Sequence, residues 1–104
     1  MKVAVFCGAD NKNTTFDTQA LDLGESLARS KMELVNGGSC TGAMKHLNKG
    51  YINQGQKTNV LGIIPEQWNK EGIIYPGIKI TPVKTLPERL LTFNNNSDAV
   101  VVFP

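Results

Sequence analysis

The stretch LVNGGSCTGAM, residues 34–44, contains the residue types best suited to binding an anion. Gly37, Gly38 and Gly42 carry no Cβ, so backbone N–H groups can approach a ligand closely at these positions. A helix is predicted to begin at the last of these glycines, and a helix N-terminus carries a partial positive charge. Ser39 adds a hydroxyl donor. The stretch therefore predicts a phosphate-binding turn, and the alternative is a tight strand-to-helix turn that holds no ligand.

This stretch differs from the two common phosphate-binding motifs. It lacks the Gly-Lys-Ser/Thr that ends a P-loop. In the dinucleotide motif G-x-G-x-x-G the glycines follow the first strand, whereas these glycines follow the second predicted strand. An anion site here would therefore be of another type.

Arg89 is the second group whose position suggests chemistry. It lies in the first turn of a predicted helix, where the helix dipole disfavours a cation, so a nearby anion would explain its placement. A solvated surface charge is the alternative. Glu88 lies three residues after Thr85 and is expected to complete a capping box. Trp68 could stack on a base, but we expect it to pack within its loop.

Short apolar runs alternate with helical stripes along the chain, which indicates a parallel sheet with crossover helices. The predicted strands cover residues 2–6, 33–36, 59–64, 78–83 and 99–103. The predicted helices are one capped by Thr14 that buries Phe16, Ala20, Leu23 and Leu27, one over residues 42–53 that buries Met44, Leu47 and Tyr51, and one opening at residues 85–88 that buries Leu86, Leu90 and Phe93. Residues 66–77 are expected to be irregular.

These elements predict an α/β fold, a Rossmann-like three-layer sandwich with a mainly parallel sheet of five strands. Right-handed crossovers favour the strand order 3-2-1-4-5. In such sheets the ligand lies beyond the carboxyl ends of the strands, where the strand order reverses, which is between strands 1 and 4 in this order. Gly8, Ala9 and Asp10 should then form the floor of the crevice, and residues 37–42 its wall.

The closing run DAVVVFP predicts an unprotected edge strand. Residues 99–103 are apolar throughout and carry no charge, proline or bulge along their length, which are the features that normally blunt an edge. The predicted order places this strand at the end of the sheet. We therefore expect another strand to cover it, either from a longer chain or from a second copy.

Composition places the 104 residues in one soluble domain and excludes several classes of function. The net charge is +2 and the lysines are scattered, which argues against a nucleic-acid-binding surface. No apolar run reaches the roughly 20 residues of a membrane span, and the N-terminus does not read as a signal peptide. The two cysteines, Cys7 and Cys40, lack metal-ligand spacing, so we expect reduced thiols, no metal site and a cytoplasmic location, with a disulfide as the alternative.

Three segments together resemble a known family. FCGAD after the first strand, the GGSCTGAM turn and PERLL at the start of a late helix occur in the order seen in Lonely Guy (LOG) proteins. Members of that family are nucleoside 5′-monophosphate phosphoribohydrolases that release cytokinin bases. The resemblance runs over residues 1–104 and corresponds to the N-terminal part of a family member. It implies a nucleoside 5′-monophosphate such as AMP as the substrate, no cofactor, and a homodimer or higher oligomer.

The resemblance also implies site residues. The family turn has three glycines, two variable residues, then a glycine and a methionine; its matches here are Gly37, Gly38, Gly42 and Met44, and Ser39 replaces the third glycine. The family helix opens with an acidic residue, an arginine and a lysine. Arg89 matches the arginine and is the implied catalytic residue, whereas Leu90 occupies the lysine position. Glu71 is the nearest match to a substrate-contacting glutamate, with an offset of one residue.

The family differs from this chain after the last strand. There the strand runs into a proline, two glycines and G-T-x-x-E, and that glutamate works with the arginine on the N-glycosidic bond. This sequence reaches Pro104. The resemblance therefore implies a domain over residues 1–104 that is incomplete at its C-terminus, and a phosphoribohydrolase-like function that is incomplete as well. The alternatives are a nucleotide- or phosphate-binding module without catalysis and a fragment with no function of its own.

Overall fold

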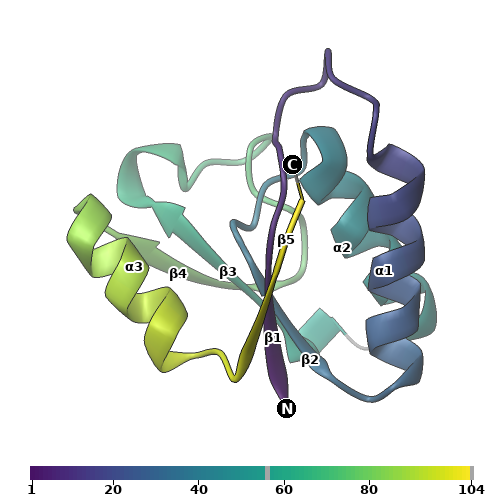
Figure 1. Ribbon diagram of the computed structural model, residues 1–104. Helices are drawn as coiled ribbons and strands as arrows, with labels where there is room; N and C mark the ends of the chain where they lie inside the picture. Colours follow the sequence, from purple (N-terminus) through teal and green to yellow (C-terminus); the bar gives the residue numbers. More distant parts are fainter. Residues whose placement is uncertain (56, 104) are drawn as a thin grey trace.

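Five parallel strands form a single sheet in the order β4-β3-β2-β1-β5 (Figure 1). The strands are β1 (Lys2–Phe6), β2 (Glu33–Asn36), β3 (Val60–Pro65), β4 (Lys79–Val83) and β5 (Ala99–Val102). The computed structural model describes residues 1–55 and 57–103, so Pro104 lies outside the described residues. The Rossmann-like α/β fold with a five-stranded parallel sheet is confirmed, and every strand lies within one residue of its predicted bounds.

The predicted strand order 3-2-1-4-5 is wrong, because β4 lies beside β3 instead of beside β1. The chain between these strands forms only the short 3₁₀ helix η2 (Glu66–Trp68) and turns, so it has no long helix to carry it back across the sheet. β4 pairs directly with β3, with Leu61 opposite Lys79. The strand order consequently reverses between β1 and β5. β5 still lies at an edge of the sheet, as predicted.

Helices cover the two faces of the sheet unequally (Figure 1). α1 (Asp17–Arg29) and α2 (Gly42–Gln54) lie on one face, α3 (Leu86–Asn95) lies on the other, and the 3₁₀ helix η1 (Lys57–Asn59) precedes β3. α1 begins at Asp17 without a side-chain cap, so the predicted Thr14 cap is wrong. Of the residues predicted to be buried in the first two helices, Ala20, Leu27, Met44, Leu47 and Tyr51 are buried. In the described residues no helix has the length and apolar character needed to cross a membrane.

Two hydrophobic clusters form on opposite faces of the sheet because side chains alternate along each strand. Val3 and Val5 of β1 belong to the cluster under α1 and α2. Ala4, between them, belongs to the cluster that contains Phe93 of α3. On the α3 face, however, β5 leaves Val100 and Val102 uncovered, with exposed fractions of 58% and 68%.

α3 buries only part of the stripe predicted for it. Phe93 is buried as expected, but Leu86 and Leu90 are 66% and 60% exposed, so that part of the prediction is wrong. The side facing the sheet is built on Arg89 and Phe93, which lie one turn apart. The Phe93 ring lies 4.8 Å from the ring of Phe6, and the Arg89 guanidinium lies 5.5 Å from the Phe93 ring centre. Leu86 and Leu90 share the helical stripe of Phe93 but are not covered by the sheet.

Candidate active site

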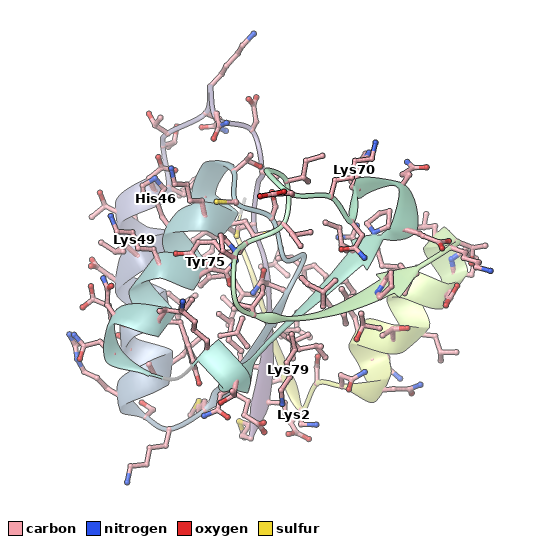
Figure 2. The ribbon with its side chains drawn as sticks, turned by 180° about the vertical axis from the view of Figure 1, so that it is seen from behind. Lys2, His46, Lys49, Lys70, Tyr75 and Lys79 are labelled. Atoms are coloured by element: carbon pink, nitrogen blue, oxygen red, sulfur yellow. The ribbon has the colours of Figure 1, made fainter. Side chains whose placement is uncertain are left out.

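A cavity of about 460 Å³ opens at the carboxyl end of the sheet. Its wall comes from the ends of β1, β2 and β3, the residues around η2, and α3; it consists of Val5, Phe6, Cys7, Ala9, Gly37, Ser39, Thr41, Met44, Ile64, Trp68, Ile73, Arg89 and Phe93. In Figure 2 this end of the molecule is marked by Lys70, just after η2. The opposite end is marked by Lys2 and Lys79, the first residues of β1 and β4. The volume is within the range typical of small-molecule sites.

A second cavity of about 790 Å³ lies next to the first and is bounded by the ends of β3 and β4 and the start of α3. Trp68 and Arg89 line both cavities. The second cavity also contains Glu66, a carboxylate that the sequence analysis did not single out. Its position directly after the third strand was the available signal, because loops at the carboxyl ends of parallel strands build the ligand sites of these folds.

Five of the predicted site residues line the first cavity, namely Ala9, Gly37, Ser39, Met44 and Arg89. The other four do not line it: Gly8, Gly38, Gly42 and Glu71. Gly8 and Asp10 instead border a separate small cavity of about 40 Å³, so of the predicted crevice floor only Ala9 reaches the main cavity. Glu71 is exposed in the turn after η2.

The backbone amides of the glycine turn are already bonded within the protein. The Gly38 N–H donates to the Asn36 side chain at 2.7 Å, and the Gly42 N–H donates to the Asn11 side chain at 2.8 Å. The Cys40 N–H donates to the carbonyl of Ile73 at 2.7 Å. The expected cradle of open amides is therefore absent at these three positions, because the protein supplies the acceptors itself.

Two contacts that the sequence analysis missed hold the turn in this form. Asn36 and Asn48 are fully buried and exchange side-chain hydrogen bonds of 2.7 and 3.2 Å, which fixes the Asn36 oxygen beneath Gly38. On the other side, residues 73–75 run antiparallel to residues 38–40, and the Tyr75 N–H donates to the Gly38 carbonyl at 2.8 Å. Figure 2 labels Tyr75 on this segment. The buried asparagines on a strand end and a helix inner face were the available signal.

Among the described residues, Arg89 is the only charged side chain that lines the first cavity. Its Nε donates to the Ile63 carbonyl at 3.4 Å, and its Nη2 reaches the glycine turn, where a Cβ on Gly37 would lie only 3.1 Å from it. In the described part of the chain no carboxylate lies within ion-pair distance of Arg89. Burial lowers the pKa of its guanidinium, because desolvation disfavours the charged form.

Glu88, the neighbour of Arg89, has a structural role. The Glu88 N–H donates to Oγ1 of Thr85 at 3.2 Å, and the Glu88 carboxylate accepts from the Lys84 N–H at 3.0 Å. The predicted capping interaction is confirmed, with the return bond made one residue before the N-cap. This carboxylate is therefore engaged at the helix start and does not pair with Arg89.

The remaining reactive side chains do not form a catalytic group. Burial raises the pKa of the Cys7 thiol to about 11, so this cavity residue is protonated at neutral pH. Cys7 and Cys40 are both free thiols, as expected. His46 pairs with Asp17 at 3.2 Å on the α1–α2 side (Figure 2). Over residues 1–55 and 57–103 there is no cluster of three or more side chains able to hold a metal ion.

The sequence profile of the SLOG cluster4 family matches residues 1–104. The chain belongs to this family. The predicted resemblance to LOG proteins is also confirmed by its relatives. The chain is 31% identical over 104 residues to the probable cytokinin riboside 5′-monophosphate phosphoribohydrolase LOG4 of Oryza sativa subsp. japonica, and the match covers 98% of the chain and 44% of the relative. It is 39% identical over 67 residues to the cytokinin riboside 5′-monophosphate phosphoribohydrolase of Rhodococcoides fascians, covering 64% of the chain and 33% of the relative.

Solved structures support the SLOG cluster4 fold. The X-ray structure of TM1055 is 30% identical and superposes with a TM-score of 0.72 over 98% of the chain and 59% of that structure. A molybdenum cofactor binding protein from Rippkaea orientalis reaches a TM-score of 0.79 at 20% identity over 97% of the chain and 60% of that structure, which shows a shared fold only. The chain spans less than half the length of the rice relative that it matches.

Two positions set this SLOG cluster4 chain apart from the LOG motifs. Ser39, in place of the third glycine, lies in the cavity wall with its Oγ 2.6 Å from Oγ1 of Thr41. Leu90, in place of the lysine, is exposed and does not line the first cavity. Relative to the LOG motif, Leu90 therefore removes a positive charge from the exposed surface of α3, whereas Ser39 changes the wall of the first cavity.

Proposed function

We propose that the protein to which these residues belong is a nucleoside 5′-monophosphate phosphoribohydrolase, and that residues 1–103 supply the binding part of its site. The observation that carries the proposal is Arg89, a half-buried cation that faces an apolar cavity without a carboxylate partner among the described residues. An unpaired buried charge is costly, and an anionic ligand would compensate it. A guanidinium also matches phosphate geometry through two parallel hydrogen bonds.

The names of the relatives support the same substrate class, since the rice and Rhodococcoides proteins are described as acting on cytokinin riboside 5′-monophosphate. The proposal includes AMP as the first nucleotide to test, a cytoplasmic location and a homodimer or higher oligomer. With most turn amides engaged, the phosphate would be held by Arg89 and by the hydroxyls of Ser39 and Thr41. Gly37 would serve by keeping the space beside Arg89 open.

Hydrolysis needs a further group. Cleavage of an N-glycosidic bond passes through an oxocarbenium-like transition state, which enzymes stabilise with carboxylates. No carboxylate lines the 460 Å³ cavity among the described residues, and Glu66 lies in the neighbouring cavity. This observation favours the second candidate, a nucleotide-binding module without hydrolysis. The two candidates share the binding site and differ in whether free base is released.

One set of measurements separates them. The protein is incubated with AMP, free base and ribose 5-phosphate are quantified, and AMP binding is measured by calorimetry. Release of base supports the hydrolase, and saturable binding without release supports the module. Arg89→Ala should weaken AMP binding by about 10- to 150-fold, the loss expected for hydrogen bonds to a charged group. Arg29→Ala, which removes an exposed arginine paired with Glu25 on α1, is the control. Unchanged AMP affinity in Arg89→Ala would exclude the proposed site.

A further inference from the structure

Trp68 is a large apolar side chain that the protein leaves 52% exposed. It belongs to neither hydrophobic cluster, so the expectation that it packs within its loop is wrong. The backbone that carries it is nevertheless fixed. The Asn69 N–H donates to the Glu66 carbonyl at 3.1 Å, and the Lys70 N–H donates to the Trp68 carbonyl at 2.9 Å. A hydrogen-bonded turn thus presents a half-exposed indole at the carboxyl end of β3.

The surroundings of Trp68 point to a ligand rather than to solvent. Trp68 and Arg89 are the two residues shared by the walls of both cavities, so the ring and the cation stand together at the boundary between them. On one side of this boundary the first cavity offers mainly apolar wall, with Ile64, Ile73 and Phe93. A flat aromatic group bound there could stack on the Trp68 indole and contact this apolar surface, with Arg89 in the same wall.

We propose that Trp68 stacks on the base of the nucleotide whose phosphate Arg89 binds, and that it makes the site selective for purines over pyrimidines. This inference rests on the proposed function. Stacking of a base on an aromatic side chain is worth about 1–3 kcal/mol, and it grows with the overlapping ring area, which is larger for a two-ring base. The short η2 helix positions the Trp68 ring, and α3 positions the Arg89 guanidinium.

Trp68 is the only tryptophan in the chain, so its fluorescence reports on this position alone. Titration with AMP should quench the emission, whereas ribose 5-phosphate should compete with AMP without quenching. Trp68→Ala should weaken AMP affinity by roughly 5- to 150-fold and leave ribose 5-phosphate affinity unchanged. Trp68→Phe should retain most of the affinity and the preference for AMP over CMP. Leu91→Ala, which shortens an equally exposed side chain outside the cavities, is the matched control.

The outcomes distinguish this inference from the proposed function. If calorimetry shows AMP binding that leaves the emission unchanged and is not weakened in Trp68→Ala, the stacking role is overturned while the proposed function stands. If the unmodified protein binds neither AMP nor ribose 5-phosphate, the proposed function fails and the stacking role fails with it. Quenching by AMP, loss of AMP affinity in Trp68→Ala and its recovery in Trp68→Phe would together support the inference.

Discussion

Arg89 and Cys7 line the same cavity, and burial affects them in different ways. For Arg89 the charge persists, and no carboxylate among the described residues pairs with it. For Cys7 burial raises the pKa to about 11, so the thiol stays neutral and contributes apolar surface to the wall. Because a thiolate rather than a thiol is the nucleophile, this difference makes the cavity suited to binding and unsuited to cysteine chemistry at neutral pH.

The neutral state of Cys7 can be measured directly. In a Cys40→Ser variant, where Cys7 is the only thiol, the alkylation rate should rise with an apparent pKa near 11 in the folded protein and near 9 in denaturant. Because the pKa of Cys7 is higher in the folded protein than in the unfolded one, the contribution of Cys7 to the free energy of unfolding is complete below pH 9. This contribution is lost as the pH rises toward 11. A folded-state midpoint near 9 would show that Cys7 is not desolvated.

At the scale of residues the sequence identified Arg89 from the helix dipole, because that argument needs only the local position. It did not identify the engagement of the Cys40 and Gly42 amides, because their acceptors, Ile73 and Asn11, lie more than 30 residues away in the sequence. For the same reason the sequence does not predict that Trp68 is exposed. Whether a side chain is covered depends on distant segments, which local pattern does not determine.

At the scale of elements, α1 and α2 pack unusually closely through two glycines. A Cβ on Gly24 would lie 2.8 Å from the Tyr51 amide nitrogen, and a Cβ on Gly50 would lie 2.9 Å from the carbonyl carbon of Leu21. The two helices therefore meet backbone to backbone. α2 begins at the glycine turn, so this contact also fixes the turn that forms part of the cavity wall.

Gly50→Ala tests this contact. In an exposed helix position the change would stabilise the protein by about 1 kcal/mol, because alanine has the higher helix propensity. Here we expect destabilisation by about 1–3 kcal/mol, the usual cost of overpacking. Urea unfolding gives the difference, and Ser26→Ala, an exposed site on α1, should change stability by no more than a few tenths of a kcal/mol in the favourable direction. A more stable Gly50→Ala variant would contradict the close packing.

The elements themselves were largely readable from the sequence. The strands and the inner faces of α1 and α2 follow from apolar periodicity, because these elements are covered by the rest of the chain. The buried face of α3 could not be predicted in the same way. Leu86, Leu90 and Phe93 share a helical stripe, but only Phe93 packs against the sheet. Periodicity shows which residues can be buried together, and the available partner decides which of them are.

At the scale of the whole molecule, the sheet ends in an edge without protection. Val100 and Val102 are exposed on one face of β5, and the outer side of β5 pairs with no strand among the described residues. The sequence predicted this edge even though it gave the wrong strand order, because both orders leave the fifth strand at one end. The error lay in β4, whose place depends on how residues 66–78 cross the sheet.

We expect the 104-residue chain to associate through this edge. Light scattering after size exclusion should show a mass that rises with protein concentration. Val102→Lys should suppress the association, because a charge on an edge strand disfavours pairing with another chain. Gln19→Lys adds the same charge at an exposed site on α1 and should leave the association unchanged. A single monomeric species at high concentration in the unmodified chain would contradict this prediction.

The pairing of β1 with β5 has a consequence for synthesis of the protein. β1 is made first, yet the strand that completes its second side is the last in this sequence, with Val3 opposite Ala99 and Phe6 opposite Val102. On the ribosome, α1, β2, α2 and β3 can assemble while that side of β1 still has bare amides and carbonyls. A polypeptide stalled or cleaved before Ala99 would keep this side open and would be a target for chaperones and proteases.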